Sequence, residues 1–163
     1  MSAAPVAAET LNFFASLDIP IFDVLGQSEA TAPICFNTDT NQEWRLYTAG
    51  RPMRGIQARV DPNTGEVQFK GRIVMMGYMK MPEETEAAID AQGWLHTGDQ
   101  AVIDADGFVK ITGRLKELIV TAGGENVSPV PIENKIMELC PLIANCVVVG
   151  DKRKFLSCLI SLK

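Results

Sequence analysis

The chain of 163 residues has one histidine, no run of Lys or Arg, and no long hydrophobic run. Its net charge is −5, so we do not expect it to bind nucleic acid. The longest apolar stretch, around Ile143–Val149, is far too short to cross a bilayer. The first residues show no basic segment followed by an apolar one, as a signal peptide would. We therefore expect a cytoplasmic protein that is soluble, or at most peripheral to an intracellular membrane.

The cysteines also lack a pattern. None of the four is spaced as C-x-x-C, and a single histidine cannot supply a ligand pair. A metal site built from thiolates and imidazoles is therefore not expected. We predict buried, reduced thiols, which suit a reducing compartment. The cysteines are Cys35, Cys140, Cys146 and Cys158.

What the sequence does contain is typical of a soluble globular protein, with 47% hydrophobic and 21% charged residues. Its length allows one sizeable core, or one core with a small appendage. The residue patterns predict an α+β fold, with a boundary near Arg114–Lys116 and a first strand that has no partner nearby in sequence. Helices are predicted at 6–17, 82–89 and 129–139, the last capped by Ser128, and strands at 21–25, 44–47, 56–60, 66–71, 118–121, 147–149 and 155–162. Two hairpins are predicted, turning at 61–65 and at Asp106-Gly107.

Gly26-Gln27-Ser28-Glu29 follows the first apolar strand, with 26–33 predicted as a loop. A hydroxyl beside a carboxylate at the end of a strand can hold a phosphate oxygen and a hard cation such as Mg²⁺. A polar turn without a ligand explains the same residues, and the segment alone does not decide between them.

Thr97-Gly98-Asp99 places a carboxylate where both oxygens could accept hydrogen bonds from the two hydroxyls of a ribose. A capping aspartate is the plainer interpretation. Arg114 could give a second contact to the same sugar, or it could form a surface salt bridge. His96 has no Ser, Cys or Asp constellation around it, so we favour a hydrogen-bonded histidine over a catalytic one.

TAGGEN, residues 121–126, is rich in glycine but lacks the spacing G-x-x-x-x-G-K-[ST] of a phosphate-binding loop. Glycine could let this backbone approach a ligand closely, or the segment could be a tight turn.

Three longer stretches carry a more specific signal: LGQSEAT, GEVQFKGRIVMMGYMKMPEETEAAIDAQGWLHTGD and GRLKELIVTAGGENVSPVPIENKI. In this order they closely resemble successive signatures of the adenylate-forming superfamily, which includes acyl- and aryl-CoA synthetases, peptide-synthetase adenylation domains and luciferases. SAAPVAAETLNFF, VMMGY and CLISLK are most similar to the bubblegum-type branch of the long-chain fatty acyl-CoA synthetases. The resemblance implies the end of a large α/β domain with a β-rich subdomain at 1–114. The start of a small mobile α+β domain would follow at 115–163.

The resemblance also implies a ligase that works in two steps. A fatty acid carboxylate attacks the α-phosphate of ATP, which gives an acyl-adenylate and pyrophosphate. The thiol of CoA then attacks the activated carbonyl, and AMP leaves. ATP, Mg²⁺ and CoA, as co-substrate, are therefore the expected small-molecule partners.

The matching positions suggest a role for each candidate residue. Ser28 would hydrogen-bond the α-phosphate and Glu29 would bind Mg²⁺, while Asp99 would accept from the ribose hydroxyls with the help of Arg114. Lys116 matches the hinge of the small domain, and Glu133 matches a structural position. The loop for thioester formation would be Gly123 and Gly124, and the remaining nucleotide contacts would be Ala3, Ala4, Pro5, Leu25 and Gly26.

The sequence departs from the family pattern in several ways. Position 25 usually carries an aromatic residue that stacks on adenine, and replacing the stack with Leu25 should cost on the order of 1 kcal/mol. A phosphate loop rich in Ser, Thr and Gly is not found, nor is a later catalytic lysine, and Lys163 lacks the surrounding motif. We therefore expect an internal slice of a larger ligase that does not form acyl-adenylate alone. An unpaired first strand would also favour aggregation.

Two alternatives remain at this point. The chain could be part of an adenylation domain that loads a carrier protein, although VMMGY and GWLHTGD favour an acyl-CoA synthetase. It could also be a non-catalytic, nucleotide-binding remnant.

Overall fold

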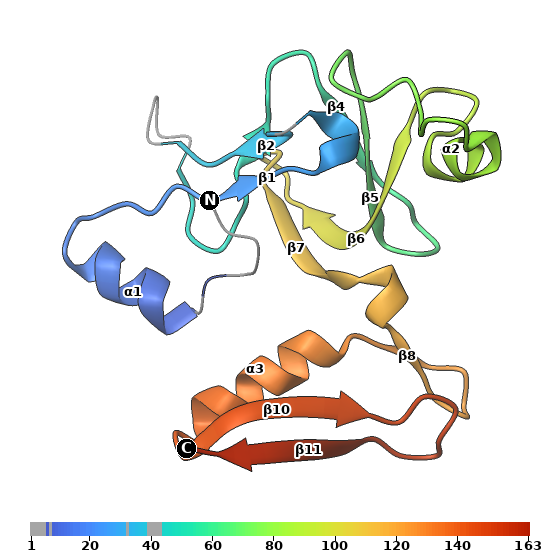
Figure 1. Cartoon of the computed structure of the whole chain (residues 1–163). Coiled ribbons are helices and arrows are strands. Elements are labelled where there is room, and N and C mark those ends of the chain that lie inside the picture. Colours follow the sequence, from blue (N-terminus) through green and yellow to red (C-terminus); the bar gives the residue numbers. More distant parts are fainter. Residues whose placement is uncertain (1–5, 7, 32, 39–43) are drawn as a thin grey trace. The chain divides into compact units, whose positions relative to one another are not determined.

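The computed structural model describes residues 6, 8–31, 33–38 and 44–163. The chain forms two compact units, Met1–Ile111 and Thr112–Lys163. Each unit combines helices with antiparallel strands, which confirms the predicted α+β fold (Figure 1).

The first unit contains two sheets. One has the order β1-β2-β3, and the other has the order β4-β5-β6-β7. Its strands are β1 (Val24–Leu25), β2 (Cys35–Phe36), β3 (Arg51–Pro52), β4 (Gln57–Val60), β5 (Glu66–Lys70), β6 (Leu95–Ile103) and β7 (Val109–Arg114), the last of which continues into the second unit. Its helices are α1 (Ala8–Ser16), the 3₁₀ turn η1 (Ser28–Ala30) and α2 (Pro82–Ala88).

Both predicted hairpin turns are confirmed. Between β4 and β5, a carboxylate oxygen of Asp61 accepts from the backbone N–H groups of Asn63 and Thr64, at 2.8 and 2.9 Å. Between β6 and β7, Asp104 accepts in the same way from Asp106 and Phe108, both at 2.9 Å. An aspartate that bonds the backbone two residues further on stabilises such turns locally.

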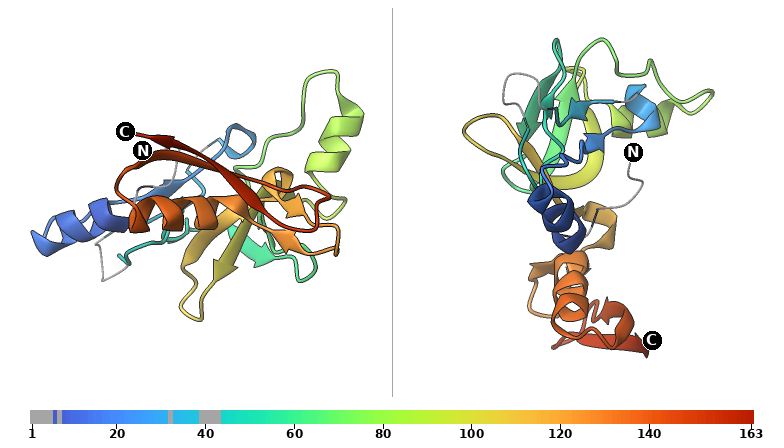
Figure 2. Two further views of the ribbon diagram at one scale, coloured as in Figure 1. Left: turned by 90° about the horizontal axis from the view of Figure 1, so that it is seen from below. Right: turned by 90° about the vertical axis from the view of Figure 1, so that its left-hand side faces the viewer.

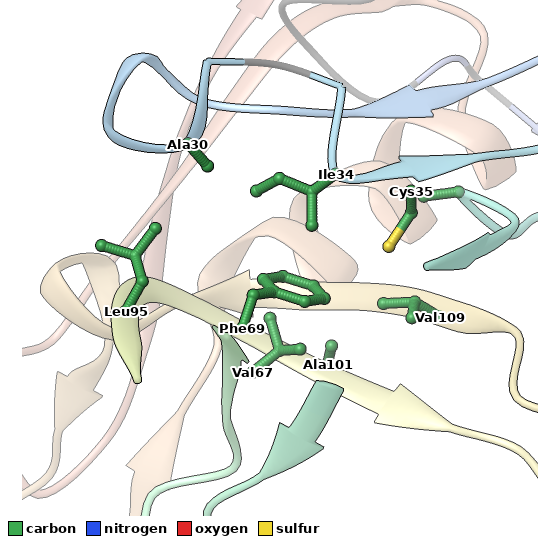
Figure 3. Close-up of a cluster of buried hydrophobic side chains, with 9 residues drawn as sticks. Ala30, Ile34, Cys35, Val67, Phe69, Leu95, Ala101 and Val109 are labelled. Atoms are coloured by element: carbon green, nitrogen blue, oxygen red, sulfur yellow. The ribbon is translucent and has the colours of Figure 1, made fainter. Parts of the chain in front are cut away.

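The two sheets of the first unit share one hydrophobic core (Figure 3). Phe69 of β5 is completely buried, and Ile34 lies over its ring from the segment before β2. The other buried members of this core are Ala30, Cys35, Ala49, Val67, Leu95, Ala101 and Val109. Residues from η1 and from β6 therefore pack in the same core.

Two predictions about strands are wrong. The first strand is not unpaired, because Val24 and Leu25 lie opposite Phe36 and Cys35 in an antiparallel ladder. Residues 44–47 do not form a strand. The Asn37 side chain binds both the N–H and the carbonyl of Arg45, each at 2.9 Å. These bonds replace a strand partner, and the chain turns at Tyr47, where φ is 63°.

The second unit contains a helix and two hairpins. Its elements are the 3₁₀ turn η3 (Leu115–Glu117), β8 (Ile119–Val120), β9 (Asn126–Val127), α3 (Pro129–Leu139), β10 (Ile143–Val149) and β11 (Ser157–Leu162). β8 pairs with β9 and β10 pairs with β11, both antiparallel. Helix α3 packs against β10, and the views in Figures 1 and 2 show it along the β10–β11 hairpin.

The start of α3 differs from its prediction in one detail. Pro129 occupies the first turn as expected. Ser128 stands at the N-cap position, but its hydroxyl donates to the carbonyl of Thr112 at 3.3 Å and does not cap the helix.

The four cysteines are all free, and they differ in how far they are buried. Cys35 and Cys146 are buried, as predicted, and Cys140 is only partly buried. The prediction is wrong for Cys158, which is exposed on β11 like every other residue of that strand. Among the described residues, no helix combines the length and the apolar character needed to cross a membrane.

Candidate functional site

Thr97, Gly98 and Asp99 form a bulge in β6. In the ladder with β5, His96 lies opposite Gln68 and Gln100 lies opposite Glu66, so residues 97–99 have only Val67 across from them. Gly98 has a φ of 72°, in the left-handed region that favours glycine. A bulge of this kind bends a strand and re-aims its side chains. The bulge therefore sets Asp99 apart from the regular ladder.

A buried carboxylate holds this bulge in place. Glu66 is only 6% exposed, and its Oε1 accepts from the backbone N–H of Gly98 at 2.8 Å. Its Oε2 accepts from Nδ1 of His96 at 2.8 Å and from Nε2 of Gln68 at 3.1 Å. His96 is thus a hydrogen-bonded histidine, as we favoured. Because a buried carboxylate without partners is costly, these bonds act together to fix the backbone at Gly98.

The hydroxyl of Thr97 completes the bulge. It donates to the carbonyl of Val67 at 2.6 Å and accepts from the backbone N–H of Asp99 at 3.1 Å. The side chain of Thr97 therefore replaces the ladder hydrogen bond that the bulge removes. It also orients the backbone at Asp99. Asp99 itself is partly exposed.

Ser28 and Glu29 lie in η1, which the sequence predicted as loop. Ser28 is exposed, and its hydroxyl has no hydrogen-bond partner among the described residues. Glu29 is held twice, by the N–H of Met75 on its backbone carbonyl at 2.8 Å and by the hydroxyl of Tyr78 on its Oε1 at 2.7 Å. The hydroxyl group is available to a ligand, and the carboxylate is pre-oriented.

The shared core connects these two segments. Ala30, directly after Glu29, is fully buried in the core to which Leu95 and Ala101 of β6 also belong (Figure 3). The Ser28-Glu29 pair and the bulge at Asp99 are therefore anchored to one packed body. Leu25 packs against that core from β1 and is partly exposed, whereas Gly26 is exposed.

The remaining predicted site residues belong to the second unit or lie outside the described residues. Arg114 ends β7 and is exposed, and Lys116 is exposed in η3. Gly123 and Gly124 form the exposed turn between β8 and β9, so a tight turn is present, with the N–H of Gly124 bonded to the carbonyl of Thr121 at 2.9 Å. Ala3, Ala4 and Pro5 fall outside the described residues.

Sequence reasoning missed two residues, Glu66 and Tyr78. Glu66 is the first residue of a predicted strand, where a charged side chain is ordinarily solvated. For Tyr78 the sequence offered a signal in VMMGYMK, because a polar aromatic residue stands there next to a run of apolar residues.

Among the described residues, no group of three or more His, Cys, Asp or Glu side chains could hold a metal ion. A cation at Glu29 would therefore need further oxygen ligands from its substrate.

Comparisons with known protein families match most of the chain. The AMP-binding enzyme family matches residues 1–79, and the AMP-binding enzyme C-terminal domain matches residues 116–163. The long-chain-fatty-acid–CoA ligase ACSBG2 of Gallus gallus is 50% identical over 165 residues, which cover 99% of this chain and 21% of that ligase. The chain spans between 21% and 24% of the length of the curated relatives that it matches.

Solved structures of CoA synthetases are also similar to this chain over nearly its whole length. The o-succinylbenzoate CoA synthetase of Bacillus subtilis in complex with its acyl-adenylate intermediate has a TM-score of 0.85 and 26% identity, covering 99% of this chain and 35% of that one. The same enzyme in complex with ATP and magnesium has a TM-score of 0.82 and 26% identity, covering 98% and 35%.

Proposed function

Because the chain belongs to the family of AMP-binding enzymes, we propose that it forms part of a long-chain fatty acid–CoA ligase of the bubblegum type. The observation that carries this proposal is the bulge at residues 97–99, which a buried Glu66 holds in a fixed conformation. A ribose diol needs an acceptor that does not have to reorganise on binding, and the fixed backbone at Gly98 supports the proposal that Asp99 is that acceptor.

In the first step, a fatty acid carboxylate attacks the α-phosphate of ATP and pyrophosphate leaves. The exposed hydroxyl of Ser28 would donate to an oxygen of that phosphate. Asp99 would accept from the ribose hydroxyls, and Arg114 would assist it. Mg²⁺, when bound, would offset the negative charge of the phosphates, and Glu29 is the carboxylate that would hold it.

Leu25 would lie beside the adenine. Its side chain covers the base with apolar surface but offers no ring for stacking, so nucleotide affinity should fall by on the order of 1 kcal/mol relative to an aromatic residue. Gly26 next to it remains a predicted contact to the nucleotide, and Ala3, Ala4 and Pro5 remain predicted contacts to the adenine.

In the second step, the thiol of CoA attacks the acyl-adenylate and AMP leaves. We assign the domains to 1–114 and 115–163, with Lys116 as the hinge between them. The exposed turn at Gly123 and Gly124 would lie along the pantetheine arm, where side chains would obstruct the approach. A cytoplasmic location with peripheral membrane association suits this chemistry, since long-chain fatty acids partition into bilayers.

The test is a chimera in which these 163 residues replace the matching segment of the Gallus gallus ligase. Acyl-CoA formation from a long-chain fatty acid, ATP, Mg²⁺ and CoA is the expected result. A soluble, folded chimera that forms neither acyl-adenylate nor acyl-CoA would contradict the proposal. Transfer to a phosphopantetheinylated carrier protein with no transfer to CoA would instead support an adenylation domain.

A further inference from the structure

The β10–β11 hairpin, which Figure 1 shows in the second unit, carries Cys146 on β10 and Cys158 on β11. In the antiparallel ladder, Cys146 lies opposite Ile160, and Cys158 lies opposite Val148. Side chains directly across a ladder share a face, and so do the side chains of residues two positions apart on one strand. Cys146 and Cys158 are therefore diagonal neighbours on one face of the hairpin.

The two strands are closest at these positions. The backbone N–H of Val148 donates to Oε1 of Glu133 on α3 at 2.7 Å, so it points away from β11. Val148 and Cys158 are therefore a non-hydrogen-bonded pair, the kind in which opposite residues approach more closely. The two kinds of pair alternate along an antiparallel ladder, so Cys146 and Ile160, two positions further on, are also of the close kind.

The two thiols interact directly but differ in accessibility. Burial raises the pKa of the Cys146 thiol, and the Cys158 thiol raises it further through its charge and a side-chain hydrogen bond. Such a bond requires the two side chains to be in contact, which a disulfide also requires. Cys146 is only 5% exposed, whereas Cys158 is exposed. An oxidant in solution therefore meets Cys158 first.

A metal ion is a poorer explanation of this pair of thiols. A structural zinc site takes four protein ligands. Throughout residues 112–163, all of which the structure describes, no third His, Cys, Asp or Glu side chain completes a metal-binding group. The nearby carboxylate of Glu133 already accepts from the backbone of Val148. Two neighbouring thiols without further ligands are suited to forming a disulfide.

We propose that Cys146 and Cys158 form a reversible disulfide when the protein meets a peroxide. The proposal needs only the second unit and does not depend on the proposed function. The sulfur of Cys158 attacks hydrogen peroxide, so an S–O bond forms, the O–O bond breaks, and water leaves behind a sulfenic acid. The sulfur of Cys146 then attacks the sulfur of Cys158, so the S–S bond forms, the S–O bond breaks, and a second water leaves with the thiol proton. The thiols lose two electrons and two protons to the peroxide, and a dithiol reductant restores them.

Oxidation of the reduced 163-residue chain with hydrogen peroxide, followed by mass spectrometry without reduction, tests this pair. Trypsin leaves Cys140 and Cys146 together on residues 136–152 and leaves Cys158 on residues 155–163. We expect these two peptides to be joined within one chain, with the loss of two hydrogen atoms and reversal by dithiothreitol. Cys140→Ser should form the link as the parent does, whereas Cys146→Ser should not. A link only between two copies of the chain, a link that persists in Cys146→Ser, or oxidation of Cys158 without any link would overturn the proposal.

The same oxidation in concentrated urea shows whether the fold directs the pairing, and it uses the parent chain alone. Cys140 and Cys146 would close loops of similar length with Cys158, so an unfolded chain should favour Cys146 by only about twofold. In the folded chain, we expect links to Cys146 to exceed links to Cys140 by about tenfold or more, as read from fragments of the joined peptides. An equal excess in the folded and the unfolded chain would show that the hairpin does not set the pairing, and would overturn the proposal.

Discussion

The hydroxyl of Tyr78 donates a hydrogen bond of 2.7 Å to Oε1 of Glu29, although the two residues are far apart in the sequence. This bond to Glu29 raises the pKa of Tyr78 above its usual value. The phenol therefore remains a donor throughout the physiological pH range. The backbone N–H of Tyr78 is in turn bonded to Oγ1 of Thr85 on α2, at 2.9 Å. Tyr78 thus acts as a positioning residue for the carboxylate to which we assign Mg²⁺.

Substitution Tyr78→Phe removes the donor and keeps the ring. We expect the Mg²⁺ concentration for half-maximal ATP–pyrophosphate exchange in the chimera to rise about threefold to tenfold, because Glu29 loses its fixed orientation. Tyr47→Phe, which removes a hydroxyl bonded to Asn12, is the matched control and should leave the Mg²⁺ dependence unchanged. A Tyr78→Phe variant with the original Mg²⁺ midpoint would show that the bond does not position the carboxylate.

Substitution Gly98→Ala tests the bulge. A β-carbon at this position meets nothing within 4 Å, but φ is 72°, so the cost is conformational. We expect the free energy of unfolding of the chain in urea to fall by about 1 kcal/mol. Gly123→Ala is the control, since its φ lies outside the left-handed region and its nearest contact is at 3.8 Å. Equal stability of the two variants would contradict a left-handed backbone at Gly98.

The sequence predicted much of the fold where the signal was local. The turns at Asp61 and Asp104 and the helix that begins at Pro82 depend on residues a few positions apart, and all three are present. The strand predicted at 44–47 is wrong, because the conformation of this segment depends on the hydrogen bonds from the Asn37 side chain to the backbone of Arg45. The first strand was predicted to be unpaired because its partner, at Cys35 and Phe36, is only two residues long.

The candidate site was predicted less completely than the fold. The motif resemblance singled out Asp99, Ser28 and Glu29, but not the residues that hold them. Glu66 and Tyr78 act through long-range contacts, at 2.8 Å to Gly98 and 2.7 Å to Glu29, and a pattern of neighbouring residues does not encode such contacts.

Substitution Glu133→Gln tests a structural role in the second unit. Oε1 of Glu133 accepts from the backbone N–H of Val148 at 2.7 Å, which ties α3 to β10. A neutral amide weakens this charge-assisted bond, so we expect the free energy of unfolding to fall by about 1 kcal/mol. Glu138→Gln on the exposed face of α3 is the control. If both variants unfold at the same urea concentration, Glu133 does not stabilise the unit.

The cysteines should differ in reactivity. Burial raises the pKa of the Cys35 thiol to about 12, so at pH 8 only about one molecule in 10⁴ carries the thiolate that reacts. Cys158 is exposed. We expect iodoacetamide to alkylate Cys158 first and Cys35 only after unfolding, as read by peptide mass spectrometry. Early alkylation of Cys35 in the folded chain would be inconsistent with its buried position.

The most direct test of the nucleotide site is the kcat/KM for ATP in the chimera that carries Asp99→Asn. An amide keeps the size of the side chain but is neutral and replaces one acceptor oxygen with a donor, so its two ends cannot each accept from one ribose hydroxyl. We predict a fall of about 100-fold. Asp106→Asn, at an exposed carboxylate that pairs with Arg45, should leave the value unchanged. An Asp99→Asn enzyme that uses ATP as well as the parent would contradict the assignment of Asp99 to the ribose.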